Sequence, residues 1–455
     1  MNKLNIYQER RNALAKQIHA KTGGGIAVIS TAPELTRNRD SEFPYRHDSD
    51  FYYLTGFEEP GATLVMQVSA SGKNVQVQSH IFCKPKDPER EIWDGIRLGP
   101  EAAPKTLGIE FAHSSEVLDQ KLGDLLADQD AVYIRLAESA EADRRLRHWM
   151  KKVRGQARSG VNPPSEFHDV ETLIHEMRLF KDAHEIDIMR RAAAISAHAH
   201  IRAMQACKPG MREYQLEAEL LHEFRNSGSQ SVAYNSIVAA GANSCILHYR
   251  AGSTELRSGE LCLIDAGCEL DSYASDITRT FPVNGKFTGA QRALYDITLA
   301  AQEAAIAITK PGSTFMQPHE AALKVLTQGL LDEKLLKLSE LGSLENAIET
   351  AAYRRFYMHR TSHWLGMDVH DVGSYRERTE QTTSDEKPWR ILKSGMVITI
   401  EPGLYIRPAD DVDEKFWNIG IRIEDDAVIN DSGCELISRG VPVKADEIEA
   451  LMKHT

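Results

Sequence analysis

The stretch LCLIDAGCELDSYASDITRTF, residues 261–281, decides how the second half of this chain folds. Its first four residues are apolar and predict a short buried strand that ends at Asp265. Asp276 follows within a second strand-like run, and an antiparallel hairpin would bring the two carboxylates side by side. Adjacent carboxylates in an apolar setting repel each other, and a cation between them removes that cost. The structural alternative is an ion pair between Asp276 and Arg279.

A glutamate version of this arrangement follows further along the chain. The apolar run 396–400 predicts a strand that leads directly into Glu401. In GIRIEDD, residues 420–426, a strand would place Arg422 and Glu424 on one face. A buried strand rarely ends in an uncompensated carboxylate. These glutamates are therefore candidate ligands, with structural ion pairs involving Arg422 as the alternative.

A repeated helix pattern precedes both strand-rich regions. One amphipathic helix pattern ends at Lys-Pro-Gly, residues 208–210, and another ends at the same tripeptide, residues 310–312. Each is followed by a second helix and then by a strand-rich region, at about 231–283 and 356–430. The order predicts an internal duplication, although Pro-Gly after a helix is also common punctuation.

The first part of the chain alternates helical and strand-like patterns and predicts a mixed α/β domain. The Gly- and Pro-rich segment 160–164 breaks this periodicity and is the best candidate for a linker. The clearest elements before it are strands at 26–29, 62–68 and 75–82 and a helix at 144–153.

Three histidines lie close together in MHRTSHWLGMDVHD, residues 358–371. Imidazole is a common ligand of divalent metals and a good proton carrier. His359 and His363 have the spacing of a zinc-protease helix, but Arg360 stands where that motif needs a glutamate base. The following Trp-Leu-Gly also predicts a loop or strand, so the zinc-protease interpretation is disfavoured.

Composition excludes several classes of protein. The chain has 455 residues, 42% hydrophobic and 26% charged, which is typical of a folded protein of two or three domains. Its net charge of -12 disfavours nucleic acid and anionic membranes as partners. The N-terminus lacks the apolar core of a signal peptide, and the six cysteines form no CxxC pair. We expect buried, reduced thiols and a cytoplasmic location.

Taken together, the candidate ligands are four carboxylates and one histidine. Such a set suits hard or borderline divalent ions such as manganese. Bridging carboxylates would hold two ions and generate a hydroxide nucleophile.

The strings IDAG, SDITRTFPV, SHWLGMDVHD, EPGLYI and GIRIEDD resemble the pita-bread metallopeptidases, and most closely aminopeptidase P. The string RNRDSEFPYR, running on through DSDFYYLTGF, is similar to the first domain of that family. The resemblance covers nearly the whole chain. It implies an α/β N-terminal domain, residues 1–174, followed by an α+β pita-bread catalytic domain, residues 175–455, with an internal pseudo-two-fold duplication.

The resemblance also implies an activity. The enzyme would be a dinuclear metallopeptidase, with manganese as the expected metal, that hydrolyses the bond between an N-terminal residue and a following proline. A metal-bridging hydroxide would be the nucleophile. The substrates would be peptides with proline in second position, and the enzyme would be a homodimer or homotetramer. By resemblance, the metal ligands would be Asp265, Asp276, His363, Glu401 and Glu424. The catalytic residues would be His248, His359, His370, Glu401 and Arg422. The substrate-binding residues would be Asp40, Trp93, Tyr234, His359, Tyr405 and Arg422.

The sequence departs from the family pattern at one place. An arginine is expected shortly before the strand that leads to Glu401, and Pro388 stands near that offset. We expect Arg376, Arg378 or Arg390 to replace it. The nearest alternative activity is that of a prolidase, which cleaves only Xaa-Pro dipeptides. The complete set of ligands argues against a catalytically inactive binding protein and against a metal-independent, creatinase-like amidinohydrolase.

Overall fold

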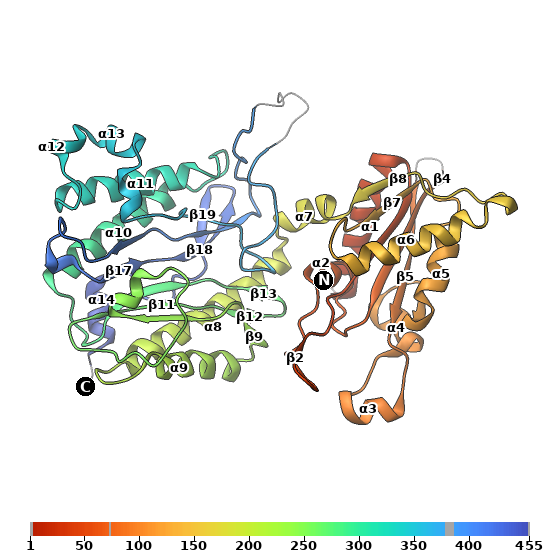
Figure 1. Cartoon of the computed structure of the whole chain (residues 1–455), viewed down its shortest axis with the longest axis horizontal. Helices are drawn as coiled ribbons and strands as arrows, with labels where there is room; N and C mark the ends of the chain where they lie inside the picture. Colours follow the sequence, from red (N-terminus) through yellow and green to blue (C-terminus); the bar gives the residue numbers. More distant parts are fainter. Residues whose placement is uncertain (1–2, 72–73, 378–385, 454–455) are drawn as a thin grey trace. The chain divides into compact units, whose positions relative to one another are not determined.

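The computed structural model describes residues 3–71, 74–377 and 386–453 and divides the chain into two compact units, Met1–Met177 and Arg178–Thr455 (Figure 1). The first is α/β and the second α+β, which confirms the fold class predicted from the sequence. Each unit is described separately below.

The first unit is built on a six-stranded mixed sheet in the order β6-β5-β4-β1-β7-β8. The β1–β4 and β4–β5 pairs are antiparallel, whereas β5–β6, β1–β7 and β7–β8 are parallel. The three strands predicted here are confirmed as β1, β4 and β5. The strands are β1 Gly25–Ser30, β2 Thr36–Asn38, β3 Ser41–Glu42, β4 Thr63–Ser71, β5 Asn74–Cys83, β6 Phe111–Ser114, β7 Ala131–Ile134 and β8 Glu166–Asp169.

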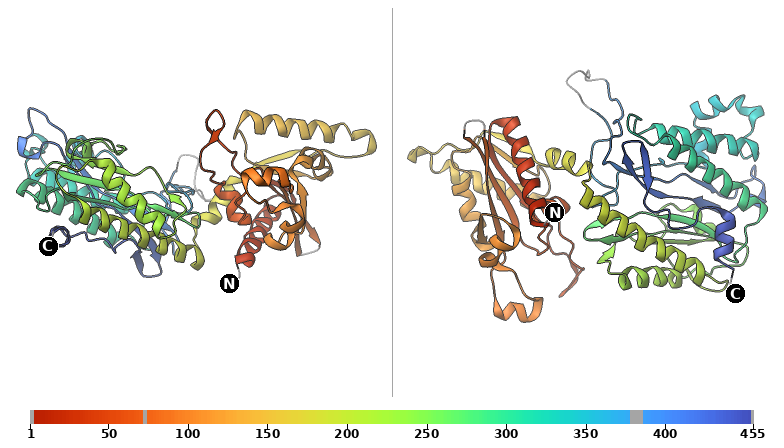
Figure 2. Two further views of the ribbon diagram at one scale, coloured as in Figure 1. Left: turned by 90° about the horizontal axis from the view of Figure 1, so that it is seen from below. Right: turned by 180° about the vertical axis from the view of Figure 1, so that it is seen from behind.

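Helices cover this sheet. Helix α1 contacts β1, β4 and β5 (Figure 2). Side chains of α5 and α6, including Leu122 and Trp149, join Ile26, Val28 and Phe82 in one apolar core. The helix predicted at 144–153 lies within α6. The helices are α1 Lys3–Thr22, α2 Ser49–Thr55, α3 Pro88–Asp94, α4 Gly99–Leu107, α5 Leu118–Leu125, α6 Ala140–Arg154 and α7 Glu171–Leu179.

The linker prediction was wrong. Residues 160–164 lie before β8, and β8 still pairs with β7 in the sheet of the first unit. The Gly- and Pro-rich composition therefore marks a surface loop inside this unit. The boundary between the two units falls within α7.

In the second unit, two helix pairs each precede a set of strands. The pair α8–α9 leads into β9–β14, and α10–α11, followed by the short α12 and α13, leads into β15–β19. This repeated order agrees with the predicted duplication. The helices are α8 Ala183–Ala206, α9 Glu213–Asn226, α10 Gly289–Ile308, α11 Gln317–Asp332, α12 Leu338–Leu341, α13 Leu344–Glu349 and α14 Ala445–Leu451.

The strands of the second unit form small antiparallel sheets, including β10-β11-β14, β15-β18-β19 and β16-β17. In the first of these, Asp265 is paired with Thr278, so that Asp276 lies just before β14. The strands are β9 Ser231–Val232, β10 Ile237–Ala240, β11 Leu261–Asp265, β12 Cys268–Leu270, β13 Tyr273–Ala274, β14 Thr278–Pro282, β15 Val397–Ile400, β16 Gly403–Ile406, β17 Ile419–Arg422, β18 Asp425–Asn430 and β19 Gly433–Leu436.

The single strand predicted for residues 420–426 is instead two strands. β17 ends at Arg422 and pairs with β16, whereas β18 begins at Asp425 and pairs with β15. Glu424 therefore lies in the crossing between two sheets. This position lets one short segment deliver both Arg422 and Glu424 to the same site.

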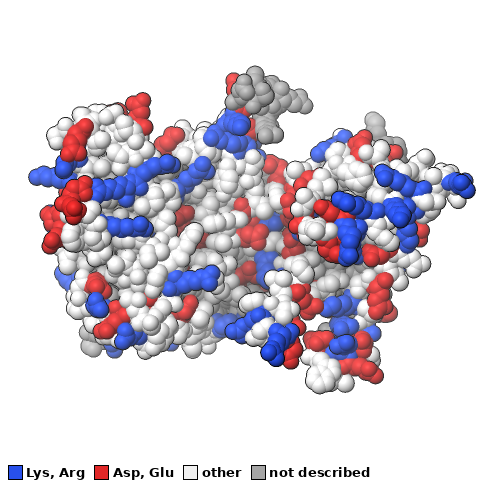
Figure 3. Space-filling view, viewed as in Figure 1, with Lys and Arg blue, Asp and Glu red and all other residues white. Residues whose placement is uncertain are grey.

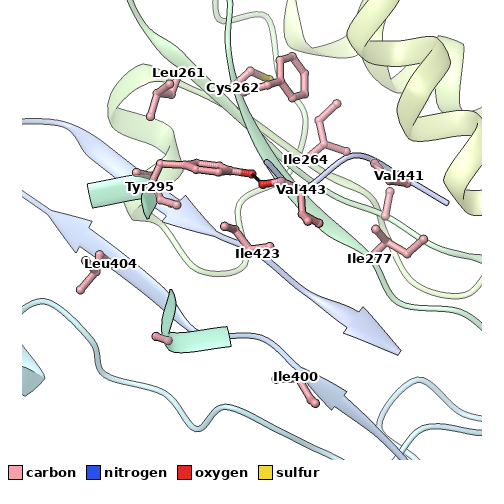
Figure 4. Close-up of a cluster of buried hydrophobic side chains, with 14 of the residues drawn as sticks. Leu261, Cys262, Ile264, Ile277, Tyr295, Ile400, Leu404, Ile423, Val441 and Val443 are labelled. Atoms are coloured by element: carbon pink, nitrogen blue, oxygen red, sulfur yellow. Dashed lines mark hydrogen bonds between the residues drawn. The ribbon is translucent and has the colours of Figure 1, made fainter. Parts of the chain in front are cut away.

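An apolar core joins the two sets of strands. Ile264 and Ile277 from the first set belong to the same buried cluster as Ile400 and Ile423 from the second (Figure 4). Tyr295 of α10 is fully buried in this cluster, and its hydroxyl donates to the Val443 carbonyl at 2.8 Å. The strand ends that carry the carboxylates are thus fixed by a common core.

Acidic and basic side chains are interspersed over the surface in view (Figure 3). Among the described residues, no helix combines the length and the apolar character needed to cross a membrane.

Candidate active site

Two aspartates meet at the end of the first set of strands. Asp265 is the last residue of β11, and Asp276 precedes β14. The hydroxyl of Tyr234 lies 2.5 Å from an Oδ1 atom of each. The hairpin therefore brings the two carboxylates together, as the sequence predicts. Tyr234, predicted to bind substrate, contacts both predicted ligands.

Among the described residues of the second unit, Asp276, His363 and Glu424 form a group of possible metal ligands, with one donor atom from each within 4.8 Å of the others. His363 Nε2 lies 3.4 Å from Asp276 Oδ2 and 3.7 Å from Glu401 Oε1. His363 belongs to a non-helical loop, as expected, and its Nδ1 lies 2.9 Å from the Trp364 carbonyl. That contact directs Nε2 toward the carboxylates.

Arg422 connects Asp265 to a second row of side chains. Its Nη2 donates to Asp265 Oδ2 at 2.6 Å and its Nη1 to the Tyr405 hydroxyl at 2.9 Å. The same hydroxyl lies 2.8 Å from His359 Nε2. Tyr405 is fully buried and does not line the pocket, so its place in the structure is beneath Arg422 and His359.

Apart from Tyr405, these groups line one pocket of about 430 Å³, which is also lined by His248 and His370. The rings of His370 and His363 lie edge to face with centroids 4.3 Å apart. Burial, and then the neighbouring His363, lowers the pKa of His370. His370 is therefore neutral near pH 7 and can donate a hydrogen bond into the pocket without carrying a charge.

The pKa values of the buried carboxylates indicate that this site favours a bound cation. Burial raises the pKa of Asp276 and raises that of Glu401 to about 7, and burial together with repulsion by Asp276 raises the pKa of Glu424 well above its ordinary value. Burial would lower the pKa of His363, but Asp276 and Glu401 raise it to about 9. In the protein alone, protons occupy positions that divalent cations would take, so the donor set fits metal ions.

The surrounding polar contacts hold these ligands in place. Thr278 donates from Oγ1 to Glu424 Oε2 at 2.6 Å and accepts from Arg422 Nε at 3.2 Å. Asp426 Oδ2 accepts from the Asp276 amide at 3.1 Å. Gln302 of α10 donates to the carbonyls of Ile400 and Ile423, each of which directly precedes a ligand glutamate.

Sequence analysis missed these supporting residues. Thr278 and Gln302 have no local sequence feature that marks them, and only long-range contacts reveal their role. Asp426 alone had a visible signal, because it is one of three consecutive acidic residues in GIRIEDD.

A buried ion-pair cluster anchors the loop that carries His370. Asp371 lies between Arg178 Nη2 at 2.7 Å and Lys181 Nζ at 2.9 Å, and all three are almost completely buried. Although burial opposes it, the two cations lower the pKa of Asp371. A Cβ at Gly366 would lie 2.1 Å from Asp371 Oδ2, so only glycine permits this close approach.

The remaining candidates belong to the first unit, to parts of the second unit that do not line this pocket, or to residues outside the described ranges. Asp40 and Trp93 belong to the first unit, where both are exposed. Of the expected replacement arginines, Arg376 stacks on Trp389, Arg390 is buried, and neither lines the pocket. Arg378 lies outside the described residues.

A second acidic group in the first unit has a different character. Asp50, Glu171 and His175 are close enough to hold a metal ion. However, the Arg135 guanidinium lies 3.0 Å from both Asp50 Oδ2 and Glu171 Oε1. This cation neutralises the carboxylates, and we interpret the group as an ion-pair network.

Four carboxylates and four histidines around one pocket, delivered by two related sets of strands, define a dinuclear metallopeptidase of the pita-bread class. Comparison with known protein families assigns the chain more narrowly within this class. Residues 187–431 match metallopeptidase family M24, and residues 7–133 match the aminopeptidase P N-terminal domain. The chain belongs to the M24 metallopeptidases, in the branch that carries the aminopeptidase P N-terminal domain.

Individual relatives are similar over nearly their full length. The Xaa-Pro aminopeptidase of Escherichia coli (strain K12) is 46% identical, with 98% of this chain and 97% of that protein covered. Xaa-Pro aminopeptidase 3 of Homo sapiens is 34% identical, with 98% and 85% covered. The structure of Pseudomonas aeruginosa aminopeptidase PepP superposes with a TM-score of 0.92 at 46% identity, with 99% of this chain and 98% of that chain covered. A substrate complex of an Escherichia coli aminopeptidase P variant gives 0.92 at 45%, with the same coverage.

Proposed function

We propose that this protein is an Xaa-Pro aminopeptidase that removes an N-terminal residue from peptides with proline in second position. The observation that carries the proposal is the convergence of Asp265, Asp276, His363, Glu401 and Glu424 on one pocket. The relatives named Xaa-Pro aminopeptidase match along almost the whole chain, which supports the same specificity here.

The five ligands would hold two divalent ions, and manganese is the ion we propose. When bound, the ions would supply Lewis-acid activation of the scissile carbonyl and of the attacking water. By the family resemblance, Asp276 and Glu424 would hold both ions, Asp265 would hold one of them, and His363 with Glu401 would hold the other. The closeness of Asp276, His363 and Glu424 supports this assignment.

The histidines and Arg422 would handle the substrate. Neutral His370 donates to the carbonyl oxygen as negative charge develops there, and His248 lines the same pocket as a second candidate donor. Glu401 would accept a proton from water and pass it to the leaving nitrogen. A bond to proline is a tertiary amide without an N–H, so His359, Arg422 and the underlying Tyr405 would shape a pocket for the ring.

We also propose where the enzyme works and how it assembles. All six cysteines are free and five are buried, which agrees with a reducing compartment such as the cytoplasm. Trp93 and Ile92 of α3 are 83% and 80% exposed. Such an apolar surface supports a homodimer or homotetramer in which Asp40 and Trp93 reach the active site of a neighbouring copy.

The test is hydrolysis of Xaa-Pro-Yaa tripeptides and Xaa-Pro dipeptides, measured side by side after Mn²⁺ is added to metal-stripped protein. We expect release of the first residue from tripeptides, and a rate at least about a thousandfold lower for Asp276→Ala, because loss of a bridging carboxylate removes most metal catalysis. Cleavage confined to dipeptides would identify a prolidase. Cleavage of neither peptide by metal-loaded protein would overturn the proposed function.

A further inference from the structure

The active-site pocket contains two arginines that have no carboxylate partner among the described residues. Arg250 and Arg360 line the pocket beside Arg422. Arg422 pairs with Asp265, whereas among the described residues no carboxylate lies within ion-pair distance of Arg250 or Arg360. The charges of the four ligand carboxylates would be balanced by two divalent ions. The pocket with its metals would therefore be net positive and favour an anionic end on the substrate.

Arg360 is the better placed of the two. It directly follows His359, whose Nδ1 lies 2.8 Å from the Arg360 carbonyl. The Arg360 guanidinium lies over the ring of Trp389, 5.2 Å from its centroid. An aromatic face restrains a guanidinium while leaving its N–H groups free for a planar anion. Arg250 has no comparable contact among the described residues.

We propose that Arg360 binds the C-terminal carboxylate of short peptide substrates and thereby favours Xaa-Pro-Yaa tripeptides over longer peptides. This inference rests on the proposed function. With the proline ring beside His359, the residue after proline lies next to Arg360 along the pocket wall. Each further residue would move the carboxylate outward by up to about 3.5 Å. Arg360 acts on substrate binding and takes no part in bond cleavage.

The experiment compares a tripeptide Xaa-Pro-Yaa with its C-terminal amide on the Mn²⁺-loaded enzyme. We expect the wild type to favour the free acid by about fivefold in kcat/KM, the size of one partly exposed charge pair. Arg360→Ala should bring this ratio close to one through KM, with kcat/KM for the amide unchanged. Arg360→Lys should restore part of the preference. The wild-type ratio should fall with added NaCl, because salt screens an exposed ion pair.

Arg376→Ala is the matched control, because Arg376 stacks on the same Trp389 ring but does not line the pocket. Arg376→Ala and Arg250→Ala should both keep the acid preference. A ratio unchanged in Arg360→Ala, a wild-type ratio of one, or an equal loss in either other variant would overturn the inference alone. Failure of the wild type to cleave either peptide would overturn the proposed function, and the inference with it.

Discussion

At the scale of single residues, the Thr278 hydroxyl links the candidate ligand Glu424 to Arg422. It donates to Glu424 and accepts from Arg422, and it is completely buried. Thr278→Val keeps the shape of the side chain but leaves Glu424 Oε2 without this donor. Because partners of ligand carboxylates fix their orientation, we expect metal affinity to fall by about 10- to 100-fold. Mn²⁺ binding to metal-stripped protein, measured by calorimetry, checks this.

Thr280→Val is the control on the same strand. Thr280 Oγ1 donates to the Arg422 carbonyl and does not touch a ligand carboxylate. This variant should lose stability while keeping metal affinity within about twofold. Equal loss of affinity in both variants would show that β14 as a whole, and not the Thr278 hydroxyl, supports the site.

The candidate ligands that the structure brings together could be proposed from the sequence because each is a carboxylate or histidine with an unusual local context. Asp265 and Glu401 directly end or follow apolar strands, and desolvation of an unpaired carboxylate there is unfavourable. Tyr405 had no such signal. Its buried position beneath His359 depends on contacts between distant segments that no local pattern encodes.

At the scale of elements, α10 fixes the spacing of the two glutamate-bearing segments through Gln302. Its side-chain amide donates to the carbonyls of Ile400 and Ile423 and to Asp425 Oδ2. Gln302→Leu would leave these buried acceptors without that donor. We expect a loss of about 2–4 kcal/mol in the free energy of unfolding, measured by urea denaturation of the metal-stripped protein.

Thr298→Val on the same helix provides the comparison. The Thr298 hydroxyl donates only to the Leu294 carbonyl within α10. Its removal should lower the unfolding free energy by less than about 1 kcal/mol. If Gln302→Leu proves no more destabilising than Thr298→Val, α10 does not hold the two strands as described.

Helices were easier to predict than strand crossings. The Lys-Pro-Gly tripeptides marked the ends of α8 and α10 because proline and glycine end a helix through their own backbone geometry, without long-range contacts. The break between β17 and β18 was missed because residues 420–426 alternate as one strand would. In the structure, β17 pairs with β16 and β18 pairs with β15, and this change of partner divides the run into two strands.

At the scale of the whole molecule, a buried histidine should make the stability of the first unit depend on pH. In the first unit, burial, and then His113, lowers the pKa of His80 to about 4. Between this value and the unfolded pKa of about 6.5, the unfolded chain binds more protons than the folded one, so stability rises with pH. This contribution is complete above pH 6.5 and is lost as the pH falls toward 4.

We therefore expect the first unit to lose up to about 3 kcal/mol between pH 7 and pH 4 through His80. His80→Phe should flatten this dependence, because phenylalanine can keep the stacking on Phe111 without titrating. His148→Asn, at an exposed position on α6, should leave the pH dependence of stability unchanged. Urea unfolding of the full chain, followed by hydrogen exchange in β5, reports on this unit. An unchanged slope in His80→Phe would contradict the assignment.

The division into two units could be expected from chain length and from the change in pattern, but composition misplaced the boundary, whereas the family resemblance put it between residues 174 and 175, within α7. Residues 160–164 have the composition of a linker, yet the strand that follows them completes the first sheet. Local composition reports flexibility of the backbone, whereas a domain boundary depends on which strands pair.

The most direct test of the account is a crystal structure of Mn²⁺-soaked protein, with anomalous diffraction recorded at the manganese absorption edge. We predict two anomalous peaks in the pocket, with Asp276 and Glu424 contacting both ions, Asp265 contacting only the first, and His363 and Glu401 only the second. A single peak, or ions bound away from these five residues at full occupancy, would contradict the claim that they form a dinuclear catalytic centre.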